Sequence, residues 1–184
     1  MPQEENLEPS DVLDLSVLEQ GMPGISRNWG SFLAEGSAVC LEHHSHPKGV
    51  CLRVTGSFNT SLGIQWATVV TEQVINSWND KQELVEYGAC GVAILAVLKL
   101  ADYKVIRRAR KGTRVDYWLA NTESTMPFQE AARLEVSGIL QGNETDVARR
   151  VRQKTSRTQL SPNSLPAYVV VVEFSAPQSH MVKT

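Results

Sequence analysis

The sequence predicts a single-domain α/β (α+β) protein in which helices flank a mixed central sheet. Residues 168–174 read YVVVVEF, a continuous apolar and β-branched run that is typical of a strand covered on both faces. Residues 81–100 are apolar almost all round, which indicates a helix buried against a sheet. The second half of the chain reads helix, strand, strand, strand, helix, strand, and this order favours an α/β core.

Length and composition are those of one domain with its own core, because 184 residues include 42% apolar side chains. The first twenty residues carry six acids and no base, the reverse of a signal peptide's positive start. No apolar run approaches the roughly 18 residues of a membrane span. The three cysteines (Cys40, Cys51 and Cys90) are an odd set without framework spacing. We therefore expect reduced thiols, a cytoplasmic location and no membrane contact.

The second half of the chain is the more regular part, and it forms the predicted core at residues 80–175. Its expected elements are a helix at 81–100, strands at 103–108, 114–120 and 131–140, a helix from Asn143 or Thr145 to about residue 157, and a strand at 168–174.

The first half is predicted to be an acidic arm followed by an extension of the domain. Residues 1–22 are expected to form a flexible arm or a short docking helix that can bind a protein partner. Residues 23–184 then form the single domain, with residues 23–79 as its extension. In that extension, alternation predicts a β-hairpin of residues 36–44 and 50–54, then a strand near 59–66 and a helix near 69–78.

Two acids stand out because they are expected inside strands, where carboxylates are disfavoured. Asp116 lies in the run VDYWL, and Glu135 lies in the run LEVSG of the next predicted strand. Two carboxylates on adjacent strands repel each other unless a cation lies between them. Mg²⁺ suits such a site, since it takes one or two carboxylates and keeps waters and phosphate oxygens as its other ligands.

A strand-borne Asp followed by an acid-x-Lys signature on the next strand, between two helix-strand units, is the pattern of the PD-(D/E)XK (restriction-endonuclease-like) nucleases. Residues 112–119 (GTRVDYWL) and 133–138 (RLEVSG) resemble these two motifs. The resemblance implies Mg²⁺- or Mn²⁺-dependent cleavage of DNA. It also implies that Asp116, Glu135 and the main-chain carbonyl of Val136 bind the metal. Glu86, preferred slightly to Glu83, would be the third acid.

The chain departs from the family at Ser137, which stands where the family has its lysine. Ser137 shares one face of the strand with Glu135, but its hydroxyl brings no positive charge. The missing cation could come from Lys111, or from Arg149, Arg150 or Lys154 on the following helix. In a purely structural interpretation, Arg133 or Arg114 pairs with an acid and no metal is bound.

The basic residues are concentrated, although the net charge of the chain is −2. Residues 104–114 and 149–157 hold 11 of the 18 basic side chains, which predicts a surface for a phosphate backbone. The residues expected to contact nucleic acid are Arg107, Arg110, Arg114, Arg149, Arg150, Lys154 and Arg157. Alternatively, these charges form solvated faces or receive the acidic arm.

The leading hypothesis is a metal-dependent nuclease that acts on DNA in a bacterial-type cytosol, with Ser137 orienting water. A catalytically inactive binding or regulatory subunit is the alternative, and a structural protein without a nucleic-acid role is the third hypothesis. Trp29, Trp66 and Trp78 are scattered in the sequence, so we expect them to pack in the core and the hairpin.

Overall fold

The computed structural model describes residues 11–126, 129–159 and 165–184. Its strands are β1 (Val12–Asp14), β2 (Val50–Gly56), β3 (Thr60–Gln65), β4 (Tyr103–Arg108), β5 (Tyr117–Asn121), β6 (Ala132–Ile139), β7 (Ala167–Glu173) and β8 (Gln178–Lys183). Its helices are α1 (Ser16–Glu19), α2 (Arg27–His43), α3 (Glu72–Ser77), α4 (Lys81–Ala101) and α5 (Glu144–Gln159).

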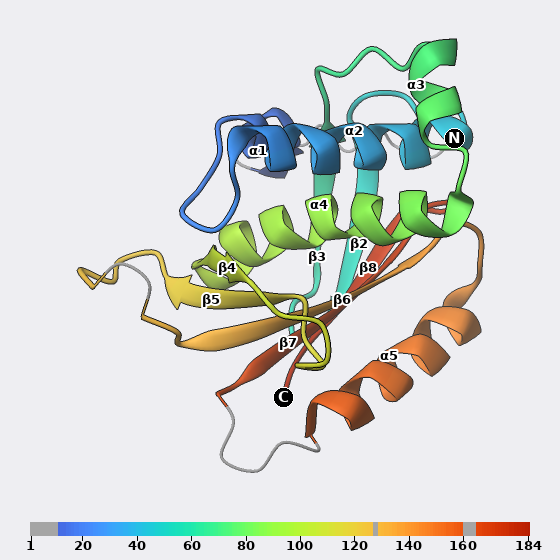
Figure 1. The fold of residues 1–184 in the computed structure, drawn as a ribbon. Coiled ribbons are helices and arrows are strands. Elements are labelled where there is room, and N and C mark those ends of the chain that lie inside the picture. Colours follow the sequence, from blue (N-terminus) through green and yellow to red (C-terminus); the bar gives the residue numbers. More distant parts are fainter. Residues whose placement is uncertain (1–10, 127–128, 160–164) are drawn as a thin grey trace.

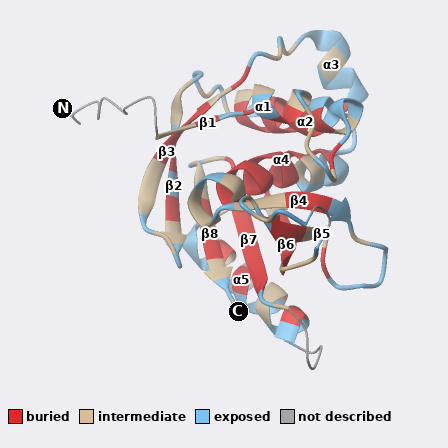
Figure 2. Cartoon of the chain, turned by 90° about the vertical axis from the view of Figure 1, so that its left-hand side faces the viewer, coloured by how far each residue is buried: buried red, intermediate tan, exposed pale blue. Residues whose placement is uncertain are grey.

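All eight strands form one mixed sheet in the order β1-β3-β2-β8-β7-β6-β5-β4. Helix α4 packs on one face of this sheet and is covered in turn by α2, while α5 lies on the opposite face (Figure 1). Burial is greatest in α4 and in the central strands β6 and β7 (Figure 2). The predicted class, a mixed sheet flanked by helices, is confirmed.

The order of elements in the second half is the predicted one: α4, β4, β5, β6, α5 and β7. Strands β4, β5 and β6 are antiparallel neighbours, and β6 and β7 run parallel, as two strands joined by a crossover helix do. Strand β8 was not predicted. It pairs with β7 on one side and β2 on the other, so it joins the two halves of the chain into a single sheet.

Helix α4 is the centre of the structure. The carboxylate of Asp80 caps its N-terminus by accepting from the backbone N–H groups of Gln82 and Glu83. By length and composition this helix could cross a membrane, but 61% of its apolar window is buried inside the fold. Such burial is expected of the core helix of a soluble protein.

The strand predicted at residues 36–44 is wrong, because residues 36–43 belong to helix α2. The helix is stable there because its small residues let it lie close to α4. The Ser37 hydroxyl, for example, makes a 2.7 Å hydrogen bond to the Gly88 carbonyl of α4. The N-terminal hairpin exists but is formed by β2 and β3 instead. The predicted strands at 50–54 and 59–66 are therefore confirmed.

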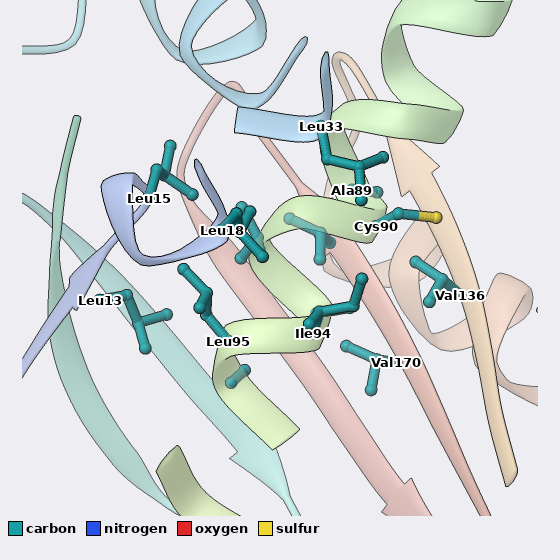
Figure 3. Close-up of a cluster of buried hydrophobic side chains, with 14 of the residues drawn as sticks. Leu13, Leu15, Leu18, Leu33, Ala89, Cys90, Ile94, Leu95, Val136 and Val170 are labelled. Atoms are coloured by element: carbon teal, nitrogen blue, oxygen red, sulfur yellow. The ribbon is translucent and has the colours of Figure 1, made fainter. Parts of the chain in front are cut away.

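The expected acidic arm lies partly outside the described residues, which begin at Asp11. From Val12 onward it is part of the fold: β1 pairs in parallel with β3 and α1 follows. Figure 3 shows Leu13, Leu15 and Leu18 clustered around α4, and all three are buried. For these residues a flexible arm is wrong, because their apolar side chains cover the central helix, whereas α1 is a short helix as the alternative had it.

All three cysteines are free thiols, as expected from their number and spacing. Cys40 is buried between α2 and α4, Cys90 is buried beside Tyr117, and burial raises the pKa of both thiols. Cys51 is exposed on β2.

Helix α5 is held to the sheet by a thin apolar contact. Val147 and Val151 pack against Ile139 and Val171 in a small second core. Asn143 caps the helix, because its side-chain oxygen accepts from the backbone N–H of Asp146, as the sequence predicted for this position. The remaining α5 side chains that reach the sheet are polar, and they form one wall of the candidate site.

Candidate active site

Strands β5 and β6 diverge at Asp116. Their pairing ends at Tyr117 and Leu134, and the Asp116 N–H still donates to the Leu134 carbonyl at 2.8 Å. On the same edge of β6, the Val136 N–H donates to Oδ2 of the Asp116 side chain at 2.7 Å. Asp116 thus stands just before β5 rather than inside a strand. Since N–H and C=O of one strand residue point to the same side, the Val136 carbonyl faces the opening as well.

The two predicted acids meet at this opening. The carboxyl groups of Asp116 and Glu135 are within hydrogen-bonding contact, although only 6% of Glu135 is exposed. Burial, together with the charge of Asp116, raises the pKa of Glu135 to about 7. Burial also raises the pKa of Asp116, against the opposing effects of the Val136 N–H and Lys154. The pair therefore takes up a proton near neutral pH.

Positive charge reaches the acids from helix α5. Lys154 Nζ donates to Glu135 Oε1 at 2.6 Å, and an Arg150 guanidinium nitrogen donates to the Ser137 hydroxyl at 2.8 Å. The Ser137 hydroxyl is therefore joined by a cation from another element. Arg133, considered as a partner of Glu135, donates from Nε to the Leu165 carbonyl at 2.8 Å.

An open cleft of about 830 Å³ lies between α4, β6 and α5, and Asp116 lies in its wall. Its lining includes four basic side chains, two acids and three glutamines: Lys81, Arg150, Lys154, Arg157, Glu86, Asp116, Gln82, Gln141 and Gln153. Gly138 lets α4 approach β6 beside the cleft, because a Cβ there would lie 2.3 Å from the Val85 carbonyl oxygen. The cleft is thus a mainly cationic groove with two carboxylates, Glu86 and Asp116, in its lining.

The donor set suits one Mg²⁺ ion, which takes hard oxygen ligands and needs only one or two carboxylates from the protein. Asp116, Glu135 and the Val136 carbonyl supply such oxygens. Within the part of the chain that the structure describes, no three His, Cys, Asp or Glu side chains are close enough to hold a metal ion. Glu86 lines the cleft but does not join the two acids in this arrangement.

The residues expected to bind nucleic acid fall into separate groups. Arg150, Lys154 and Arg157 line the cleft. Arg107 and Arg110 line a different cavity of about 230 Å³, with Arg108, Thr113 and Trp118. Arg107 also pairs with Glu130.

Three predicted basic residues lie elsewhere. Arg149 forms a 2.7 Å ion pair with Asp146. Arg114 and Lys111 are exposed in the turn before β5, and neither lines the cleft. Sequence reasoning did not predict Lys81 as a residue of the cleft. Its position in the first turn of the buried helix α4 was the signal that could have indicated it.

Comparison with known proteins gives no assignment. No protein-family model matches the chain, and no curated protein matches it significantly in sequence. A function must therefore be argued from the geometry and chemistry of the cleft.

Ionisation of Glu135 is expected to destabilise the fold as the pH rises. Its pKa is about 7 in the folded protein, compared with an ordinary value of 4.5. Between these values the folded state binds the proton more strongly than the unfolded chain does, so the free energy of unfolding falls as pH rises. Urea unfolding should show that the wild type loses about 1–3 kcal/mol relative to Glu135→Gln between about pH 5 and about pH 8. An unchanged difference between the two proteins would contradict the assignment.

Proposed function

We propose that this protein is a metal-dependent nuclease that hydrolyses phosphodiester bonds of DNA in the cytoplasm. The observation that carries the proposal is the contact between the Glu135 carboxyl group and that of Asp116, which lies in the wall of a cation-lined cleft. The order α4, β4, β5, β6, α5, β7 supports a restriction-endonuclease-like core within the larger sheet. Carboxylates hold the metal and the cations hold the phosphate backbone.

Asp116, Glu135 and the Val136 carbonyl would hold Mg²⁺ or Mn²⁺, with Glu86 assisting from α4. When bound there, such an ion would supply a metal-activated water molecule and charge stabilisation for the phosphodiester. Asp116 is already oriented for this role, because one of its oxygens is fixed by the Val136 N–H at 2.7 Å. The other Asp116 oxygen would be available to the ion.

Lys154 takes the role of the motif lysine in this proposal. Its ammonium group lies 2.6 Å from Glu135, so it stabilises the ionised carboxylate and can orient a water or a phosphate oxygen beside it. Ser137 and Arg150 form a second polar pair one step along the same face of β6. Arg157 and Lys81 would contact the phosphates on either side.

A specific observation favours the alternative, a catalytically inactive protein that binds DNA or another protein through the same groove. The Lys154 ammonium already lies where a metal would compensate Glu135. In this alternative the lysine replaces the metal permanently, and the cleft holds a polyanion without cleaving it.

Cleavage of supercoiled plasmid DNA separates the two. The nuclease is expected to nick the plasmid with Mg²⁺ or Mn²⁺ and to lose all activity when a chelator removes the metal. DNA binding that weakens steeply with salt, without nicking in either metal, would instead establish the inactive binder. Calorimetry that detects neither metal nor DNA binding would leave only a structural role.

A further inference from the structure

Four aromatic side chains that are far apart in the sequence pack together beside α2 and α4, and one of them, Trp78, is buried. Phe32 lies at the centre of this aromatic patch, which consists of Trp29, Phe32, Trp78 and Tyr87. Its ring centroid lies 5.2 Å from that of Trp29 and 4.5 Å from that of Trp78. Tyr87 of α4 meets it edge-on at 5.1 Å. Phe32 nevertheless remains 37% exposed, so the expected role of these tryptophans in packing does not account for the whole patch.

The patch is held in place by its neighbours. The Trp78 indole N–H donates to Glu35 at 2.8 Å, which fixes that ring against Phe32. On the other side, the exposed Arg108 guanidinium lies over the Trp29 ring at 4.5 Å from its centroid. The exposed Arg108 guanidinium therefore borders the aromatic patch at Trp29.

The patch adjoins the cleft at two points. On α4, the exposed Glu86 lines the cleft, and the next residue, Tyr87, belongs to the patch. On α4, Lys81 lines the cleft and also a small apolar cavity of about 230 Å³ that borders Trp78. A ligand in the cleft can thus extend onto the patch along α4.

We infer that the aromatic patch binds an unstacked base of a single-stranded nucleic acid whose backbone enters the cleft. Bases stack on exposed aromatic rings when a positively charged groove holds the strand, and Arg108 is placed to hold the adjoining phosphate. Bases inside a duplex are already stacked and paired, so they cannot stack on Phe32. The inference rests on the proposed function, because it assigns the cleft to nucleic acid, and it predicts that unpaired strands bind more tightly than duplex DNA.

Charge favours this ligand over an apolar protein segment. The patch is bordered by the Arg108 guanidinium and leads to a cleft with four basic side chains. An apolar peptide would leave these cations without counter-charges, whereas a nucleic acid supplies one phosphate for each base.

Fluorescence anisotropy in a chelator tests the inference without any cleavage. The probes are a labelled oligothymidylate of about 15 nucleotides, an abasic strand of equal length and the corresponding duplex. Phe32→Leu keeps an apolar side chain but removes the ring. It is expected to weaken oligothymidylate binding about tenfold and to leave abasic and duplex binding unchanged. Phe32→Tyr should restore the affinity.

Val69→Ala is the matched control, because Val69 is exposed and apolar but lines neither the cleft nor the small cavity beside Trp78. Circular dichroism checks that each variant is folded. Unchanged oligothymidylate binding in folded Phe32→Leu would overturn the inference and leave the patch as a protein-docking surface. An equal loss for the abasic strand would also overturn it. Ring-dependent binding by a protein that never nicks DNA would refute the nuclease proposal alone, and nicking without such binding would refute this inference alone.

Discussion

Asp116→Asn is expected to lower metal-dependent DNA cleavage by about a thousandfold without unfolding the protein. The asparagine carbonyl can still accept from the Val136 N–H, which Asp116 Oδ2 now accepts at 2.7 Å, so the end of the β5–β6 ladder is preserved. The substitution removes the charge that holds the ion, and charge stabilisation of this kind is worth several kcal/mol at a metal site. Initial rates of plasmid nicking, measured at saturating Mg²⁺, give the comparison.

Glu83→Gln is the control for this experiment. Glu83 is exposed in the first turn of α4 and does not line the cleft, whereas Glu86 on the same helix does. The control should cleave at the wild-type rate, and Glu86→Gln should reveal whether a third acid assists. If folded Asp116→Asn nicks DNA as fast as the wild type, the carboxylate pair is not the catalytic centre.

Lys154→Met is expected to lower cleavage by about a hundredfold. The methionine keeps the length and the apolar stem of the side chain but removes the cation that lies 2.6 Å from Glu135. Because the ammonium group lowers the pKa of Glu135, its loss should raise that pKa from its value of about 7. The pH at which cleavage reaches half its maximum should therefore rise in the variant, a change that a merely structural role would not produce.

Lys111→Met provides the comparison, since Lys111 was the other lysine that the sequence offered for this role. It is exposed in the turn before β5 and does not line the cleft, so the variant should keep wild-type activity. Lys154→Arg should retain part of the rate because it retains the charge. Loss of activity in Lys111→Met, with Lys154→Met unaffected, would assign the cation to the turn instead of to α5.

Sequence reasoning succeeded where the signal is local. The period of apolar residues in α4, the β-branched run of β7 and the cap at Asn143 each depend on neighbours within a few positions, and the structure has all three. It failed for α2, because residues 36–44 alternate as a strand would while their small side chains serve close helix packing. It also missed β8, whose six residues include polar side chains and become a strand by pairing with β2 and β7.

By itself, the sequence determined the core elements of the second half and singled out Asp116 and Glu135, of which only Glu135 lies inside a strand. Only the tertiary structure decided that these acids touch, that their cation is Lys154 of α5, and that Phe32 joins Tyr87 of α4. The physical reason is the distance along the chain between the residues that interact. Secondary structure follows from neighbours a few residues apart, whereas Glu135 and Lys154 meet only after a crossover helix has folded back onto the sheet.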